Sequence, residues 1–411
     1  MSSRPLDKKY IVLGVTGSIA AYKAADLASK LTQAGARVDT LLTPSATQFI
    51  TPLSFQSVTG QPAYTDEALW GAQAHVLHVG LGHTADLFLI APATANTLAK
   101  LVSGQADNLL TLAALAFGPG SNERPLVIAP AMDGGMFSHP ATQHNVEILR
   151  QRGAVIIGPE AGHLASGLEA PGRMTEPITL LGHVRYLLTR RGALQGRHVV
   201  VTAGGTQEPV DPVRVITNRS SGKQGFALAQ AALDAGAEVT LITAPTALSV
   251  PPGAKHLLVN TAAEMEQAVL KACQDADALL MAAAVADFRP SQPSEHKIKK
   301  QAGPPTLQFE PTTDILAAVA QRRAQTKVPL VVVGFAAETR DLIANAQAKM
   351  HAKRLDLVVA NDISAPGVGF AVDTNRVTFL RPNGASEFLP LISKSEVADR
   401  VIAEVISLLN K

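Results

Sequence analysis

The stretch TAGGTQEPVDPVRVITNRSSGKQGF (Thr202–Phe226) contains the pattern on which the whole chain is built, a strand that ends in glycine and then a helix. An apolar run, His198–Thr202, leads into a pair of glycines, and Ser220–Lys223 lead into a helical pattern over Gly225–Ala235. Glycine lets the backbone approach a ligand closely, and the free N–H groups at a helix start attract anions. The stretch therefore predicts an anion-binding loop, with a plain connecting loop as the alternative.

Composition indicates a globular protein with two domains. The chain has 411 residues, of which 46% are hydrophobic and 17% charged, and this length is sufficient for two cores. The net charge of +2 argues against a nucleic-acid partner, for which a strongly basic surface is expected. The single cysteine, Cys273, excludes a disulfide within the chain and a metal site built on cysteines.

The sequence predicts a cytoplasmic protein with no membrane partner. The chain contains no run of about 20 apolar residues, and residues 1–9 lack the apolar core of a signal peptide.

Short apolar runs, each ending in a small or turn-forming residue, recur along the chain and alternate with amphipathic stretches. They are Tyr10–Val15, Arg37–Leu42, Leu87–Ala91, Leu126–Ala129, Ala154–Ile157, His198–Thr202, Glu238–Ile242, Ala278–Ala282, Leu330–Gly334 and Leu357–Ala360. This alternation predicts an α/β fold with two doubly wound, Rossmann-like parallel-sheet domains. We place the domain boundary near Gly192, giving domains of residues 1–191 and 192–411.

Three hydroxyl-rich loops follow strands of the first half, at Gly14–Ala20, Thr43–Thr47 and Ala91–Asn96. None has the G-x-G-x-x-G pattern of dinucleotide sites. Because strand ends of a parallel sheet lie along one edge, the three loops together favour a mononucleotide such as FMN over NAD. The candidate residues are Gly17, Ser18, Ile19, Thr43, Ser45, Pro92, Ala93, Thr94 and Asn96.

Two further features of the first half are histidines and methionines. His75, His78 and His83 lie within nine residues; a metal cluster lacks a carboxylate or thiol to complete it, so we expect His75 and His83 to face solvent. His78 remains a candidate for catalysis. Met132 follows a strand and either packs in the core or lies against a flavin.

These motifs together resemble a known family. They are GVTGSIAAYK (Gly14–Lys23), APATAN (Ala91–Asn96), PAMDGGM (Pro130–Met136), PGRM (Pro171–Met174), DPVR (Asp211–Arg214), TNRSSGK (Thr217–Lys223), AAVADF (Ala283–Phe288), KIKK (Lys297–Lys300) and GFAAET (Gly334–Thr339). The chain resembles, over essentially its whole length, the bifunctional coenzyme A biosynthesis family. In that family phosphopantothenoylcysteine decarboxylase is fused to phosphopantothenate–cysteine ligase.

For the first half, the resemblance implies an FMN-dependent decarboxylase with His78 as a catalytic residue. FMN would accept a hydride from the thiol-bearing carbon and later return it, so that sulfur can stabilise the carbanion left by loss of CO₂. His78 would orient the substrate and assist deprotonation.

The chain departs from the family pattern at two catalytic positions. Asp133 replaces the usual asparagine of Pro-x-Met-Asn, and Ser166 replaces the cysteine of Ala-Cys-Gly, which is the family's proton donor. An ionised Asp133 would repel a substrate carboxylate, and a serine hydroxyl is a far weaker acid than a thiol. Glu169 is a hypothetical replacement acid.

For the second half, the resemblance implies a ligase that activates the carboxylate of 4′-phosphopantothenate with CTP. Asn218 would stabilise the acyl-cytidylate, and Lys297 would neutralise charge on phosphate. Asp287 would bind either ribose hydroxyls or Mg²⁺. The expected CTP and substrate residues are Met281, Ala282, Ala283, Asp287, Lys297, Thr313, Asp314, Ile315, Leu316, Phe335, Lys349 and Lys353.

The resemblance also implies partners and leaves alternatives open. The implied substrates are 4′-phosphopantothenate, cysteine and CTP, and the implied assembly is a homo-oligomer with ligase dimers and flavin-domain trimers. One alternative is a ligase whose flavin half stops at the oxidised enethiol. Another is a non-catalytic flavin-binding partner protein, and a third is a pair of dehydrogenase domains.

Overall fold

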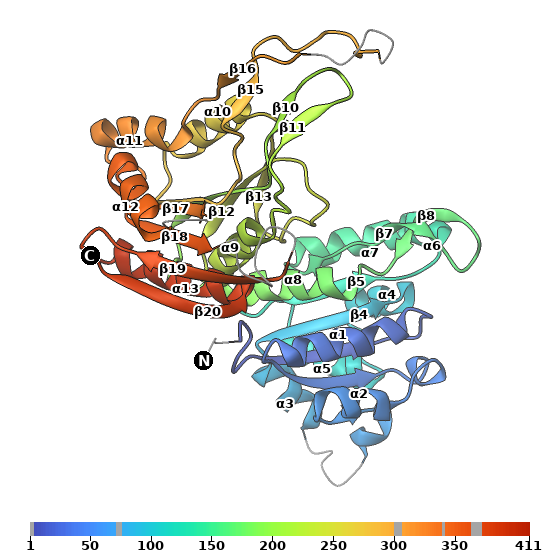
Figure 1. Cartoon of the computed structure of the whole chain (residues 1–411). Coiled ribbons are helices and arrows are strands. Elements are labelled where there is room, and N and C mark those ends of the chain that lie inside the picture. Colours follow the sequence, from blue (N-terminus) through green and yellow to red (C-terminus); the bar gives the residue numbers. More distant parts are fainter. Residues whose placement is uncertain (1–3, 71–75, 300–305, 339–341, 363–371) are drawn as a thin grey trace. The chain divides into compact units, whose positions relative to one another are not determined.

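The computed structural model describes residues 4–70, 76–299, 306–338, 342–362 and 372–411. His75, Lys300 and Thr339 therefore lie outside the described residues. The chain divides into two compact units between Thr189 and Arg190, close to the expected boundary at Gly192. Figure 1 shows the helices and strands of each unit.

The first unit contains a six-stranded parallel sheet in the order β3-β2-β1-β4-β5-β6. Its strands are β1 (Tyr10–Val15), β2 (Arg37–Leu42), β3 (Ala63–Tyr64), β4 (Leu87–Ala93), β5 (Leu126–Pro130) and β6 (Val155–Ile156). The parallel sheet and its apolar strands are confirmed. The two-residue strand β3 was not predicted because it is too short to show an apolar pattern.

Helices cover both faces of this sheet (Figure 1). They are α1 (Ala21–Gln33), α2 (Pro52–Thr59), α3 (Leu77–Thr84), α4 (Ala95–Ser103), α5 (Leu109–Phe117), α6 (Gly134–Ser138), α7 (Pro140–Gln151) and α8 (Pro177–Thr189). Local sequence sets their ends: Asn108 and Thr111 form a capping box at the start of α5, and Gly60 ends α2 in a left-handed conformation.

Two apolar clusters hold the layers of the first unit together. One joins α1 and α8 to the sheet, with Leu27 and Val184 fully buried, and the other joins α5 and α7 to the opposite face, with Leu110 and Val146 buried. Burial of such a side chain contributes about 1.5–3 kcal/mol. A hairpin, β7 (Glu160–His163) and β8 (Glu169–Arg173), lies outside the sheet.

The second unit contains an eight-stranded sheet in the order β13-β12-β9-β14-β17-β18-β19-β20. Its strands are β9 (His198–Ala203), β12 (Glu238–Thr243), β13 (Lys255–Leu258), β14 (Ala278–Met281), β17 (Val331–Glu338), β18 (Leu357–Asp362), β19 (Thr374–Leu380) and β20 (Ser386–Ser393). β19 and β20 are antiparallel. The sequence predicts parallel strands only, which is wrong for this pair. A turn containing Gly384 at positive φ joins the two strands as a hairpin.

The remaining elements of the second unit are helices and two small hairpins. The helices are α9 (Lys223–Asp234), α10 (Ala262–Ala272), α11 (Ile315–Thr326), α12 (Leu342–Lys353) and α13 (Lys394–Leu409). The hairpins pair β10 (Gln207–Pro209) with β11 (Val215–Thr217), and β15 (Phe288–Pro290) with β16 (Phe309–Pro311). The first turn of α9 packs closely on β9, because a Cβ added to Gly225 would lie 2.5 Å from the Cβ of Ala203.

Candidate active sites

The three hydroxyl-rich loops of the first unit meet at the carboxyl edge of its sheet. The hydroxyl of Thr16 donates to the carbonyl of Pro92 at 2.8 Å and accepts the N–H of Thr94 at 3.1 Å, which joins the loops after β1 and β4. A Cβ added to Gly17 would lie 2.3 Å from the Cβ of Ser45, so the loops after β1 and β2 also touch. The prediction that these loops come together is confirmed.

The predicted flavin residues divide into supporting and accessible groups. Thr43, Pro92 and Ala93 are buried and support the loops, whereas Gly17, Ser18, Ile19, Ser45, Thr94 and Asn96 are exposed or half-buried. Ser18 and Ser45 offer hydroxyl groups suited to a phosphate, and the exposed Ile19 offers an apolar surface suited to a ring. The residues present thus fit a flavin mononucleotide, in which phosphate and ring are bound on one sheet edge.

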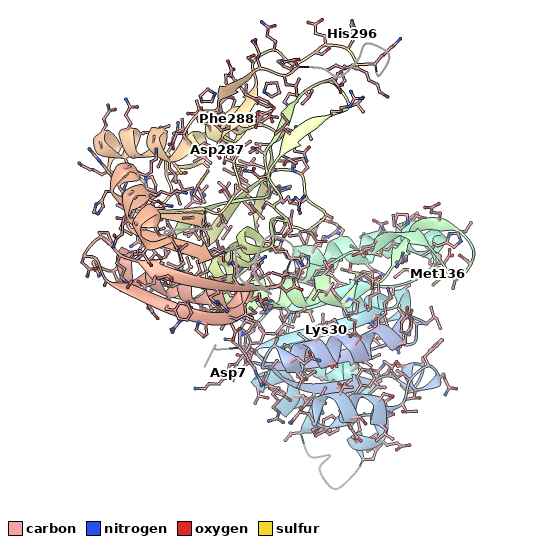
Figure 2. All side chains as sticks on the ribbon, viewed as in Figure 1. Asp7, Lys30, Met136, Asp287, Phe288 and His296 are labelled. Carbon is pink, nitrogen blue, oxygen red and sulfur yellow. The ribbon has the colours of Figure 1, made fainter. Side chains whose placement is uncertain are left out.

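The loop after β5 extends this edge. The N–H of Ala131 donates to the carbonyl of Ala93 at 3.0 Å, and the N–H of Met132 donates to the carbonyl of Gly172 on the β7–β8 hairpin at 3.0 Å. Met132 is half-buried against the apolar cluster under α5 and α7, whereas Met136 is 52% exposed on α6 (Figure 2). Met132 therefore packs partly against the core, and the rest of its side chain remains accessible.

The two residues that depart from the family pattern contact each other. The hydroxyl of Ser166, at the tip of the β7–β8 hairpin, donates to Oδ2 of Asp133 at 2.5 Å. Oδ1 of Asp133 accepts the N–H of Gly135 at 2.9 Å. These hydrogen bonds, first from Ser166 and then from Gly135, hold the pKa of the Asp133 carboxyl below its usual value. The structure therefore pairs a carboxyl group whose pKa is lowered with a serine hydroxyl, at the two positions where the family pattern has an asparagine and a cysteine.

His78 is the second residue of α3 and is half-buried. Its Nδ1 atom is buried and has no hydrogen-bond partner in the described part of the chain. Such an atom is available to a ligand or to a neighbouring molecule. His83, on the same helix, is exposed as predicted, and the expectation for His75 falls outside the described residues.

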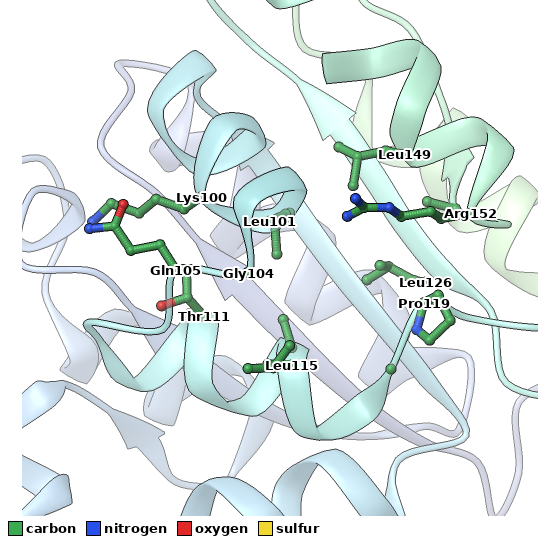
Figure 3. Close-up of a pocket in the computed structure, with 13 residues that line it drawn as sticks. Lys100, Leu101, Gly104, Gln105, Thr111, Leu115, Pro119, Leu126, Leu149 and Arg152 are labelled. Atoms are coloured by element: carbon green, nitrogen blue, oxygen red, sulfur yellow. The ribbon is translucent and has the colours of Figure 1, made fainter. Parts of the chain in front are cut away.

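A separate apolar hollow of about 240 Å³ lies between α4, α5 and α7 (Figure 3). Leu101, Leu115 and Leu149 line it, with Lys100 and Arg152 at its sides. It includes Leu126, the first residue of β5, and so lies near the amino edge of the sheet. It is thus distinct from the candidate flavin loops at the carboxyl edge.

In the second unit, a cavity of about 970 Å³ contains nearly all of the predicted ligase residues. Its lining includes Asn218, Met281, Ala282, Ala283, Asp287, Thr313, Asp314, Ile315, Leu316, Phe335, Lys349 and Lys353. Residues from four separate strand ends and two helices are thus brought together. Asp287 is exposed and lies directly before β15 (Figure 2).

Two lysines of α12 are fixed by contacts at this cavity. Nζ of Lys349 donates to the carbonyl of Phe335 at 2.7 Å, and Nζ of Lys353 pairs with Asp314. Asp314 caps α11 by accepting the N–H of Ala317 at 3.0 Å. Burial raises the pKa of Asp314, but Lys353 and the Ala317 N–H outweigh it and lower the pKa overall. Lys349 and Lys353 thus bring two cations close to the Asp314 carboxylate on one side of the cavity.

Lys297 is the one predicted ligase residue that does not line the cavity. Its side chain is exposed, and the loop that carries it is bound at the neighbouring residue, where Oδ2 of Asp211 accepts the N–H of Ile298 at 3.1 Å. The structure therefore fixes the backbone beside Lys297 without placing the lysine among the other residues.

Sequence reasoning missed several residues at this cavity. Ser220–Lys223, noted as an anion-binding loop but not assigned to the CTP site, line the cavity together with Gln224, Asn361, Asn375 and Lys394. Asn375 is 3% exposed, and its Oδ1 atom, like that of Asn361, lacks a partner among the described residues. These asparagines lie in strands without a recognisable motif, so their sequence carried no signal.

Among the described residues, no three His, Cys, Asp or Glu side chains lie close enough together to hold a metal ion. None of the helices in the described ranges is both long enough and apolar enough to span a bilayer.

Comparison with known proteins places both units. Residues 1–188 match the family described as Flavoprotein, and residues 194–409 match the DNA/pantothenate metabolism flavoprotein C-terminal domain. The coenzyme A biosynthesis bifunctional protein CoaBC of Bacillus subtilis is 42% identical over 406 residues, covering 98% of each chain. The protein of the same name from Mycobacterium tuberculosis is 42% identical over 413 residues, covering 98% of this chain and 97% of its own.

Solved structures resemble each half separately. The C-terminal domain of a CoaBC protein is 36% identical, with a TM-score of 0.45, and covers 53% of this chain and 98% of that domain. A mutant of PPC decarboxylase complexed with pantothenoylaminoethenethiol is 35% identical, with a TM-score of 0.40, and covers 43% of this chain and 97% of that one. Because the relatives from Bacillus subtilis and Mycobacterium tuberculosis match the chain over nearly its full length, the chain belongs to the family of bifunctional coenzyme A biosynthesis proteins, which combine a decarboxylase and a ligase in one polypeptide.

Proposed function

We propose that the second unit joins cysteine to 4′-phosphopantothenate at the expense of CTP, and that the first unit decarboxylates the product with bound FMN to give 4′-phosphopantetheine. The observation that carries the ligase part is the single cavity lined by every predicted nucleotide and substrate residue except Lys297. Full-length relatives of the same bifunctional family support the pairing of the two reactions.

In the ligase, the cavity residues would bind and activate the acyl group. A carboxylate is a poor acyl donor, so its oxygen would first attack the α-phosphate of CTP and displace pyrophosphate. The amine of cysteine would then attack the acyl-cytidylate, with CMP as the leaving group. Lys349 and Lys353, which line the cavity, would bind phosphates. Asn218, which also lines the cavity and donates to the carbonyl of Val285 at 3.0 Å, would bind the acyl-cytidylate. Lys297 would neutralise the negative charge that develops on phosphate during the transfer.

Mg²⁺ is part of this proposal because a triphosphate is normally bound with the ion. Asp287 lines the cavity as an exposed carboxylate, so it is available either to the ion or to the ribose hydroxyls of CTP. A single carboxylate is sufficient for Mg²⁺ when phosphates supply further oxygen ligands.

In the decarboxylase, Gly17, Ser18 and Ser45 would bind the phosphate of FMN, and Ile19 and Met132 would contact its ring. Bound FMN supplies a reversible hydride acceptor. His78, whose Nδ1 atom has no partner among the described residues, would accept the thiol proton of the substrate as general base.

Two measurements on the purified full-length protein test the proposal. The absorbance spectrum should show a flavin. Pyrophosphate should be released only when CTP, 4′-phosphopantothenate and cysteine are all present, and chelation of Mg²⁺ should stop the release. Equal activity with ATP, or a colourless protein whose substrate is not decarboxylated after FMN is added, would contradict the corresponding half of the proposal.

A further inference from the structure

The contact between Asp133 and Ser166 joins two separate elements at the edge of the candidate flavin site. Ser166 lies in a tight turn at the tip of the β7–β8 hairpin, where the N–H of Gly167 donates to the carbonyl of Leu164 at 2.9 Å. Asp133 is the N-cap of α6 and directly follows Met132, which is itself bound to the hairpin at Gly172. Backbone hydrogen bonds therefore fix the two partners on both sides of their contact.

This pair lies beside the loops that would hold the flavin. Ala131, two residues before Asp133, donates its N–H to the carbonyl of Ala93 in the loop after β4. Asp133 is half-buried and Ser166 is exposed, so a substrate bound on this edge can reach both side chains.

We propose that Asp133 and Ser166 form a proton relay for the decarboxylation, in which Asp133 takes up a proton when the substrate carboxylate binds and returns it through the Ser166 hydroxyl after CO₂ has left. This inference rests on the proposed decarboxylase function. It assigns to a hydroxyl and a carboxylate the proton-donating task that the resemblance assigns to a thiol.

The chemical reason is repulsion between two carboxylates. When two carboxylates share one site, one of them binds a proton far more readily than it does alone. A substrate carboxylate beside Asp133 therefore promotes protonation of Asp133 from solvent. Loss of CO₂ removes that repulsion, so Asp133 gives up its proton more readily at the moment when a proton is needed.

The transfer is balanced in atoms and charge. The C–C bond to the carboxylate breaks, and its electron pair passes through the α-carbon towards sulfur, which bound FMN would permit by holding the hydride of the thiol-bearing carbon. The proton of the Ser166 hydroxyl forms the new C–H bond at the α-carbon, while Oγ of Ser166 takes the proton of Asp133. The hydride would return from FMN to the thiol-bearing carbon, which gives saturated product with no net redox change. Asp133 is left ionised and accepts a hydrogen bond from Ser166, as in the present structure.

The charged residues of the hairpin do not compete for this role in the structure. They are Glu160, His163, Glu169 and Arg173, and among the described residues none of them hydrogen-bonds to Asp133. Arg173 is bound to Glu176 at 3.0 Å. The Asp133 carboxylate accepts hydrogen bonds from the Ser166 hydroxyl and the Gly135 N–H, and the N–H groups of Gly134 and Met136 also lower its pKa.

Proton uptake on binding gives a test that does not depend on turnover. Calorimetric titration of the FMN-loaded protein with 4′-phosphopantothenoylserine, in buffers of different ionisation enthalpy, should reveal uptake of roughly one proton. The same ligand without its carboxylate, 4′-phosphopantothenoylethanolamine, should bind without uptake. Asp133→Asn should abolish the uptake, and the matched variant Glu160→Gln should retain it. Binding of the serine ligand without proton uptake by the unmodified protein would overturn the proposal.

Product masses test the return of the proton. Ser166→Ala should still release CO₂ but should form saturated product at least tenfold more slowly, because a general acid contributes about 10²–10⁴-fold, and a product two hydrogens lighter should accumulate. Ser166→Cys should restore saturated product, also when combined with Asp133→Asn. Ser138→Ala, which alters a neighbouring serine on α6, is the matched control.

Two results would contradict the relay. One is undiminished saturated product in Ser166→Ala, and the other is loss of saturated product in Glu169→Gln while Ser166→Ala remains fully active. Failure of the proposed decarboxylase function would look different, since the unmodified protein would then release no CO₂.

Discussion

Asp211 holds the loop that carries Lys297 through the residue next to it, Ile298. Oδ2 of Asp211 accepts the N–H of Ile298 at 3.1 Å across 87 residues of sequence. The guanidinium of Arg214 completes the contact, because it binds both Oδ2 of Asp211 and the carbonyl of Ile298. Asp211 is 3% exposed, so this clamp joins a buried carboxylate of the β10–β11 hairpin to the Lys297 loop through charge-assisted hydrogen bonds.

We expect Asp211→Asn to slow the ligase while leaving the decarboxylase unaffected. The amide cannot accept from every N–H that the carboxylate binds, so the Lys297 loop loses its fixed position. Misplacement of a functional group by about 1 Å costs about a hundredfold in rate, and we expect pyrophosphate release to fall by about ten- to a hundredfold. Glu310→Gln, which breaks an exposed ion pair with Arg289, should have little effect. Equal loss in both variants would contradict a specific role for the clamp.

The same carboxylate predicts a pH dependence of stability. Burial raises the pKa of Asp211, but the N–H groups of Val213, Ile298 and Arg214 and the Arg214 guanidinium outweigh it and lower the pKa to about 2. Because the folded-state pKa is lower than that of the unfolded chain, Asp211 stabilises the fold above the unfolded value of about 3.9. This contribution is lost as pH falls towards 2.

The measurement is the difference in thermal unfolding midpoint between the unmodified protein and Asp211→Asn, followed from pH 6 downward. The difference should be constant from about pH 6 to pH 5 and should shrink below about pH 4, as the carboxyl is protonated in the unfolded state. A difference that grows as pH falls would show that the carboxyl is not held ionised.

We expect Gly17→Ala to weaken FMN binding. The added Cβ would lie 2.3 Å from the Cβ of Ser45, so the loops after β1 and β2 must separate. Overpacking of this kind costs about 1–3 kcal/mol, which corresponds to roughly 5- to 150-fold weaker binding. Equilibrium titration with FMN measures the effect. Gly80→Ala is the control, because a Cβ added there meets nothing within 4 Å; equal flavin affinity in both variants would place the flavin elsewhere.

Removal of the cation at position 353 should weaken nucleotide binding to the ligase. Lys353 is held at the cavity by Asp314, and a charge-assisted hydrogen bond contributes about 1.5–3 kcal/mol. We expect Lys353→Met to raise the KM for CTP by about ten- to a hundredfold, with no change in flavin content. Lys271→Met, on the exposed side of α10, is the matched control. An unchanged KM in Lys353→Met would exclude a phosphate contact at this residue.

Much of the fold could be predicted because each buried parallel strand is recognisable from its own short stretch of sequence. Tyr10–Val15 and Arg37–Leu42 form strands with the predicted bounds, since a buried parallel strand is a continuous apolar run. The antiparallel pair β19 and β20 escaped prediction because polar residues, such as Asn375 and Arg376 in β19 and Ser386 and Glu387 in β20, interrupt the apolar run.

By itself, the sequence determined the two α/β domains, the hydroxyl-rich loops at strand ends and the motifs of the family. Each of these depends on residues close together in the chain, where periodicity and turn chemistry act directly. Only the tertiary structure decided that Ser166 contacts Asp133 across 33 residues and that Asn375 contacts Gln224 across 151. Such contacts depend on how hairpins and sheet edges pack against each other. No pattern among neighbouring residues in the sequence predicts that packing.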